Sequence, residues 1–181
     1  MKLKKILLAL VLLAVLVAGI ILGAYTMHPL KYTEHIRAFS EENGVDRFLV
    51  AALIRAESNF DCTAYSKADA KGLMQLTDET AQFCAQKNGI VLAEGEVYNP
   101  EMNIRLGVFY LKRMLDLFDG DERIAIAAYN AGEGRVREWL KNSDYSLDGK
   151  TLQKIPYAET EKHVEKVVRY KKMYEILYPN L

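Results

Sequence analysis

The chain has 181 residues, and its 24 Lys and Arg are balanced by 24 Asp and Glu. Setting aside the lysines at positions 2, 4 and 5 leaves 21 basic residues against 24 acidic ones, which excludes the basic surface that nucleic-acid binding needs. Two cysteines and three scattered histidines offer no metal-ligand spacing, so we expect no metal, no other cofactor and no nucleic acid.

The N-terminus begins with a few lysines and continues as an unbroken run of apolar residues and glycine over residues 6–24. About 20 such residues let a helix cross a bilayer, whereas a secretory signal core is about 7–15 residues long and ends at a small-residue cleavage site. Gly23 and Ala24 match such a site poorly, so we expect an uncleaved anchor. The lysines place the N-terminus in the cytoplasm. We therefore expect residues 1–25 to be a cytoplasmic stub and a single transmembrane helix, and residues 26–181 to be one extracytoplasmic domain.

Beyond this run the apolar residues recur at intervals of three and four, as in amphipathic helices, and no segment alternates convincingly with a period of two. The sequence therefore predicts a mainly α fold with one domain. The expected helices cover residues 32–42, 47–57, 77–87, 103–118, 122–130, 136–140 and 158–178.

Three short strings each set one or two polar side chains in a frame of small or apolar residues. They are AESNF around Glu57, GLMQLT around Gln75, and AIAAYNAGEG around Tyr129 and Asn130. Such a frame can keep water out of a cleft while a few polar groups point into it. A fourth string, IPYAET, begins at Ile155.

The four strings, in this order, resemble the lytic transglycosylase domain of bacterial peptidoglycan-cleaving enzymes. The resemblance covers roughly residues 34–178 and implies a lysozyme-like helical domain with a cleft. It also implies a peptidoglycan glycan strand as substrate, and it names no protein partner. Membrane attachment through the N-terminal helix is expected from the apolar run itself.

Glu57 matches the catalytic position of that family, although a glutamate at a helix end is often an ordinary surface residue. The resemblance implies that Glu57 first gives a proton to the oxygen of the β-1,4 bond between MurNAc and GlcNAc. It then takes the proton of the C6 hydroxyl, which closes onto C1 to give a 1,6-anhydro end without consuming water. This requires a carboxyl that stays protonated in an apolar pocket. No second carboxylate stands in the matching strings near Glu57, so the substrate's N-acetyl group would meet the developing charge.

The resemblance also assigns a set of substrate-binding residues, each with a plainer alternative. Ser66 could be a turn residue, Met74 and Tyr129 could be core residues, Asn130 could hold the turn after its helix, and Glu159 could simply begin the last helix. Glu161 and His163 depart from the Arg and Tyr that the motif often has, which puts recognition of the peptide stem in doubt. The expected binding set is Ser66, Met74, Gln75, Tyr129, Asn130 and Glu159.

Cys62 follows the helix that bears Glu57, and Cys84 lies in the helix after GLMQLT. If the chain has the fold that the resemblance implies, these segments are neighbours, and an extracytoplasmic location permits a disulfide. Two unpaired thiols are the alternative.

Two other functions fit the same strings. One is a hydrolase that resembles goose-type lysozyme and uses Glu57 with a water molecule. The other is a catalytically silent wall-binding scaffold, although such a protein would not need Glu57, Gln75 and Tyr129.

Overall fold

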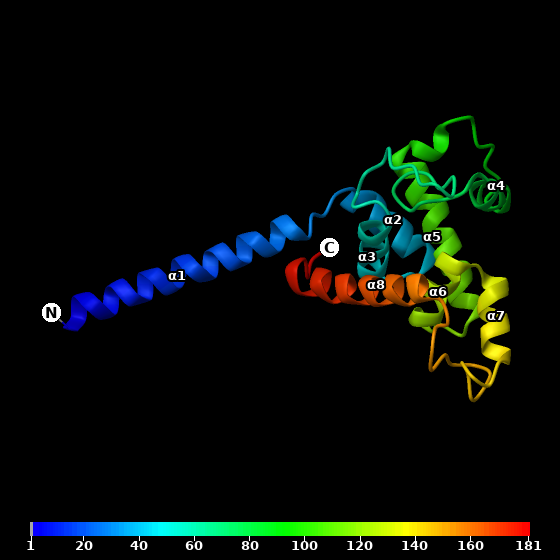
Figure 1. The fold of residues 1–181 in the computed structure, drawn as a ribbon. Helices are drawn as coiled ribbons and strands as arrows, with labels where there is room; N and C mark the ends of the chain where they lie inside the picture. Colours follow the sequence, from blue (N-terminus) through cyan, green and yellow to red (C-terminus); the bar gives the residue numbers. More distant parts are fainter. Residues whose placement is uncertain (1) are drawn as a thin grey trace.

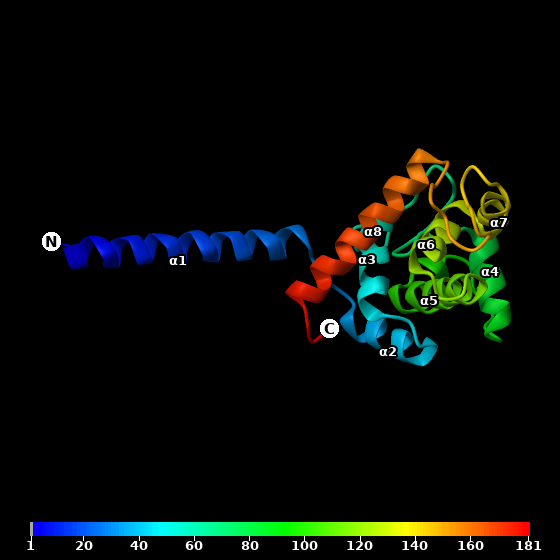
Figure 2. The same cartoon turned by 90° about the horizontal axis from the view of Figure 1, so that it is seen from below.

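One long helix, α1 (Lys2–Met27), extends away from all the others in both views of a computed structural model that describes residues 2–181 (Figures 1 and 2). The segment Leu3–Met27 is long and apolar enough to cross a membrane. The helix continues two residues past the boundary expected at residue 25, because no helix-breaking residue stands there.

The rest of the described chain is helical, with no strand among residues 2–181 and only isolated bridges that join Tyr65 to Lys71 and Lys71 to Leu76. This confirms the mainly α prediction. The elements are α2 (Thr33–Asn43), α3 (Arg47–Glu57), α4 (Asp78–Lys87), the 3₁₀ turn η1 (Glu96–Tyr98), α5 (Pro100–Leu117), α6 (Glu122–Ala131), α7 (Glu133–Lys141) and α8 (Ala158–Leu177).

Side-chain caps set where several helices begin. Asp46 accepts hydrogen bonds from the backbone at the start of α3, Thr77 does so for α4, and Asp121 for α6, which satisfies amide groups that have no partner within the helix. α5 begins three residues before the expected position because Asn99 caps it and Pro100 occupies its first turn. α7 also begins three residues early, since the glycine at position 134 does not interrupt it.

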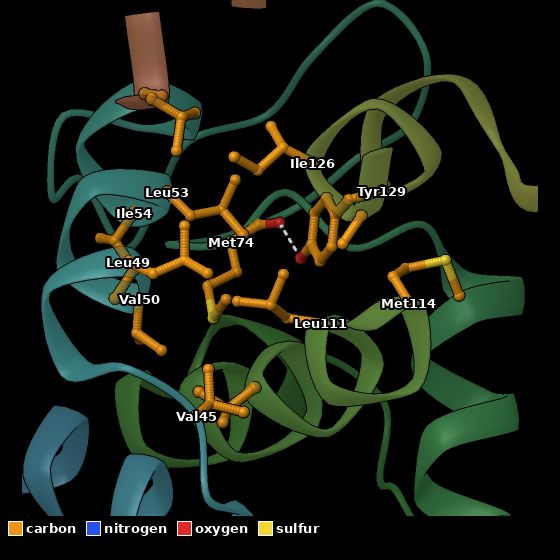
Figure 3. Close-up of a cluster of buried hydrophobic side chains, with 14 of the residues drawn as sticks. Val45, Leu49, Val50, Leu53, Ile54, Met74, Leu111, Met114, Ile126 and Tyr129 are labelled. Atoms are coloured by element: carbon orange, nitrogen blue, oxygen red, sulfur yellow. Dashed lines mark hydrogen bonds between the residues drawn. The ribbon is translucent and has the colours of Figure 1, made fainter. Parts of the chain in front are cut away.

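The hydrophobic core lies where α3, α5 and α6 meet (Figure 3). α3 is buried on most of its surface, and its Leu53 and Ile54 are fully covered. Met74, which comes from the loop before α4, fits against α5 at Gly107, where a Cβ would lie 2.3 Å from the methionine sulfur. A side chain at position 107 would therefore displace Met74, and with it the loop that borders the cleft described below.

α8 runs alongside α3 and also packs on α6 (Figure 2). Its Lys171 reaches Asp46 at 2.8 Å and Glu122 at 2.7 Å, so one ammonium group joins the N-terminal ends of α3 and α6. Lys166 donates to the carbonyl of Ala56 at 2.9 Å. These contacts place α8 directly beside the C-terminal end of α3, where Glu57 lies.

The end of α1 contacts the helical domain through tyrosines near the C-terminus. Tyr25 donates to the carbonyl of Leu177 at 2.9 Å and packs edge-on against the ring of Tyr178. Tyr174 donates to the carbonyl of Pro29 at 2.8 Å. The chain therefore leaves α1 and enters the domain beside the last turn of α8 (Figure 1).

The disulfide expected between Cys62 and Cys84 is not formed, and both are free cysteines in the structure. The two thiols face different surroundings, since Cys62 contacts Tyr32 whereas Cys84 is buried between α4 and α5 near Arg113. Burial raises the pKa of the Cys84 thiol to about 12. Cys84 is therefore a core residue of α4 rather than half of a crosslink.

Candidate active site

A cleft of about 840 Å³ opens between the loop that precedes α4, the end of α6 and the start of α8. All but one of the side chains expected at the site line it, and Met74 is the exception. Those that line it are Glu57, Ser66, Gln75, Tyr129, Asn130 and Glu159. Residues spread over a hundred positions of sequence are thus brought to one cavity by the packing of α3, α6 and α8.

Glu57 is the last residue of α3, and its side chain is only 14% exposed. The preceding turns of α3 are apolar and buried, so the carboxyl stands at the point where the core meets the cleft. Its Oε1 lies 3.3 Å from Nε2 of His163, whose side chain is 11% exposed. The next residue, Ser58, donates to the carbonyl of Leu73 at 2.8 Å, which ties the end of α3 to the loop across the cleft.

That loop turns sharply at Gly72, whose φ of +73° is a conformation that suits glycine. A Cβ there would lie 2.4 Å from Nδ2 of Asn103, so glycine is also required by close approach. Asn103, on α5, is fully buried and accepts a hydrogen bond from the amide of Met74 at 2.7 Å. It donates to the carbonyls of Lys71 at 3.0 Å and Val97 at 2.7 Å.

Gln75 also has a positive φ, +49°, and its amide nitrogen donates within the loop, to the carbonyls of Gly72 at 2.9 Å and Ala64 at 3.2 Å. The partly buried amide therefore has structural partners, and the residue still lines the cleft. Gln75 holds the loop that faces Glu57.

Met74 does not contact the cleft as expected, because its side chain is fully buried in the core. Its backbone carbonyl accepts a hydrogen bond from the hydroxyl of Tyr129 at 2.8 Å (Figure 3). Burial, and after it the nearby negative charge of Glu57, raises the pKa of Tyr129 well above the ordinary tyrosine value. The hydroxyl therefore remains protonated and fastens the loop to α6.

The other three expected residues sit at the rim with partners of their own. Ser66 accepts from the amides of Ala68 and Ala70, each at 3.2 Å, which makes it a turn serine that also lines the cleft. Asn130 accepts from the hydroxyl of Thr160 at 2.9 Å, and so joins α6 to α8 rather than bracing the turn after its own helix. Glu159 is exposed in the first turn of α8, where a carboxylate suits the helix dipole.

Sequence reasoning missed several residues that shape the site. In the sequence His163 is distinguished only as a departure from the motif, and Asn103 gives no signal because the loop residues that it holds, Lys71 and Met74, are distant in sequence. Tyr157, 48% exposed, packs edge-on against Trp139 with the ring centres 5.2 Å apart, and the Arg135 guanidinium lies 5.6 Å from its centre. Both Tyr157 and Arg135 line the cleft.

The arrangement offers one enclosed carboxyl with an imidazole beside it, amide and hydroxyl groups opposite, and an aromatic ring at the rim. Within residues 2–181 no group of three or more His, Cys, Asp or Glu side chains could hold a metal ion. The chemistry that these side chains can perform is proton transfer to and from a bound polar molecule.

Comparison with known proteins shows clear similarity over most of the chain. The family model described as Transglycosylase SLT domain matches residues 34–152. A putative soluble lytic murein transglycosylase of Haemophilus influenzae is 33% identical over 151 residues, 82% of this chain and 26% of that protein. Membrane-bound lytic murein transglycosylase C of Edwardsiella ictaluri is 30% identical over 166 residues, 80% of this chain and 46% of that protein.

Among solved structures, the lytic transglycosylase Slt of Pseudomonas aeruginosa, in the form of an inactive mutant, aligns with a TM-score of 0.74 at 34% identity. The alignment covers 82% of this chain and 24% of that one. The chain thus spans about a quarter of the length of the first curated relatives that it matches.

Proposed function

The chain belongs to the Transglycosylase SLT domain family, and from this we propose that it cleaves the MurNAc–GlcNAc β-1,4 bond of peptidoglycan without hydrolysis. The observation that carries the proposal is the position of Glu57, a largely enclosed carboxyl at the point where an apolar helix meets a cleft of about 840 Å³. A cleft of that size can enclose much of a small ligand.

In the proposed reaction Glu57 acts twice. Its proton goes to the bridging oxygen as the bond to C1 of MurNAc breaks, and GlcNAc leaves with a new hydroxyl. The C6 oxygen of the same MurNAc then bonds to C1, and its proton returns to Glu57. The sugar ends as a 1,6-anhydro ring, no water is consumed, and Glu57 is again protonated. The inactive Pseudomonas aeruginosa mutant has glutamine in place of a glutamate, which supports a glutamate in this role.

The substrate would be held from both sides of the cleft. Ser66 and Gln75 approach from the loop before α4, Asn130 from α6, and Glu159 from the start of α8. Met74 would act only through the backbone, by fixing Tyr129. The substrate's N-acetyl group would stabilise positive charge at C1, a route known among glycosidases that lack a second carboxylate in the site.

One observation favours a second candidate, hydrolysis of the same bond. Glu159 is a second carboxylate that lines the cleft, and a second carboxylate can activate water. Its exposure at the start of α8 gives it no apolar surroundings and argues for a rim position. The products separate the two reactions, because hydrolysis leaves a reducing end and transglycosylation leaves an anhydro end.

We also propose that α1 anchors the enzyme in the cytoplasmic membrane as a single pass, with residues 26–181 as the catalytic domain outside. α1 has the required length and composition, and the lysines before it favour a cytoplasmic N-terminus. The membrane-bound relative is in keeping with this placement, which would hold the cleft near the inner face of the wall.

The test is digestion of purified peptidoglycan by the full chain in mild detergent, followed by mass measurement of the released muropeptides. We expect products one water lighter than those of a lysozyme digest. Glu57→Gln should lower the rate about 10³-fold, whereas Glu165→Gln, at an exposed position of α8, should not. Products with reducing ends would support the hydrolase, and full activity of Glu57→Gln would exclude either reaction at this site.

A further inference from the structure

Beside the proposed acid lies a histidine that neither the motif nor the expected binding set assigns to the reaction. His163 lies in the second turn of α8, and its Nε2 is 3.3 Å from Oε1 of Glu57. Both side chains are largely enclosed, at 11% and 14% exposure, and both line the cleft.

The Nε2 atom of His163 is buried and has no hydrogen-bond partner among the described residues. Its contact with Glu57 is close enough for an ionic interaction but is not aligned as a hydrogen bond. Buried side-chain polar atoms in folded proteins nearly always have a hydrogen-bond partner, so one without a partner calls for an explanation. A rotation of the Glu57 carboxyl would align the two groups, so that Nε2–H donates to Oε1 and Oε2 is left to carry the proton that is transferred.

We infer that His163 is a positioning residue that orients the Glu57 carboxyl for its two proton transfers. The inference rests on the proposed function. An imidazole that donates from Nε2 to Oε1 fixes the plane of the carboxyl and leaves Oε2 to face the bridging oxygen of the substrate.

Two substitutions test this orientation. His163→Phe keeps a ring but removes the donor, and we expect it to lower kcat about tenfold with little change in KM, since misorientation of the acid affects the chemical step. His163→Gln keeps an N–H donor, and we expect it to recover most of kcat. A side chain that only packs would not need a donor, so recovery by His163→Gln separates orientation from packing.

The measurement is kcat and KM on soluble peptidoglycan strands, with His35→Gln as the matched control. His35 lies on α2, outside the cleft, and packs against Phe39, so its replacement should keep the wild-type kcat and KM. The fluorescence of Trp139, the one tryptophan, reports whether each variant is folded. If His163→Phe does not fold, His163→Leu, which also lacks a donor, takes its place.

The outcomes distinguish this inference from the proposed function. If the wild type makes anhydro products and His163→Phe keeps the wild-type kcat, or loses it with no recovery in His163→Gln, the inference is wrong, while the proposed function stands. If the wild type makes no anhydro products, the proposed function fails and the inference fails with it. A kcat that falls in His163→Phe, recovers in His163→Gln and is unchanged in His35→Gln supports the inference.

Discussion

The two walls of the cleft are held in different ways. The loop wall, residues 66–77, is fixed by hydrogen bonds from Ser58 at the end of α3, Asn103 of α5 and Tyr129 of α6. The helix wall, formed by Arg135 of α7 and residues 157–160 at the start of α8, has one side-chain hydrogen bond to α6 and is otherwise held by contacts of the half-exposed Tyr157 ring. The loop wall can therefore keep a fixed shape for the reacting bond, whereas the helix wall is suited to contacts that contribute affinity.

Among the variants that test the contrast between the two walls, Asn103→Ala should cause the largest loss in the free energy of unfolding, because it acts on the loop wall. It removes the partner of the Met74 amide and of the Val97 carbonyl, both buried, and of the part-buried Lys71 carbonyl. Each buried polar group left without a partner costs about 1–3 kcal/mol, so we expect the free energy of unfolding to fall by about 3–5 kcal/mol. Urea unfolding of the full chain in mild detergent, monitored by the fluorescence of Trp139, measures this loss.

The matched control is Gln86→Ala, which removes an exposed amide from α4 and should change stability by less than about 0.5 kcal/mol. If Asn103→Ala were as stable as the control, the loop wall would owe its shape to its own turns, and the proposed contrast between the walls would be lost.

A smaller effect should follow from Tyr129→Phe, which removes the hydroxyl bonded to the Met74 carbonyl. We expect a loss of about 1–2 kcal/mol in the free energy of unfolding at pH 7. Burial raises the pKa of Tyr129, so above about pH 10 an unfolded tyrosine loses its proton while the folded one keeps it. Loss of the proton stabilises the unfolded state of the wild type and has no counterpart in the variant. The difference in the free energy of unfolding between wild type and variant should therefore shrink as the pH rises.

Tyr110→Phe is the control, on the ring that packs against Tyr129 with the centres 5.2 Å apart. It keeps Tyr129 and its bond to the loop. The difference in the free energy of unfolding between wild type and Tyr129→Phe could instead stay constant above pH 10. That result would mean that Tyr129 ionises as readily in the folded chain as in the unfolded one.

The helices and the gathering of the motif residues were predictable because helical periodicity and the small-residue frames are local patterns. Met74 was assigned wrongly because the direction of its side chain depends on the turn at Gly72 and on space beside Gly107, neither of which its own string reveals. Asn103 and His163 could not be identified in advance, since the Met74 amide that Asn103 binds lies 29 positions away and the Glu57 carboxyl that His163 contacts lies still farther away in sequence. Long-range contacts fix the loop wall and the surroundings of Glu57, and a pattern of neighbouring residues does not contain them.

The smallest effect on stability, and the sharpest test of the helix wall, should come from Tyr157→Ala. The ring is about half exposed and covers Trp139 from one side only, so we expect a change below about 1 kcal/mol in the free energy of unfolding. Aromatic side chains provide large rigid contact surfaces, so KM for soluble glycan strands should rise about three- to tenfold while kcat stays near the wild-type value. Tyr65→Ala is the control, because Tyr65 is also exposed but does not line the cleft. A fall in kcat with unchanged KM would place Tyr157 with the reacting groups, and the helix wall would then share the function assigned to the loop wall.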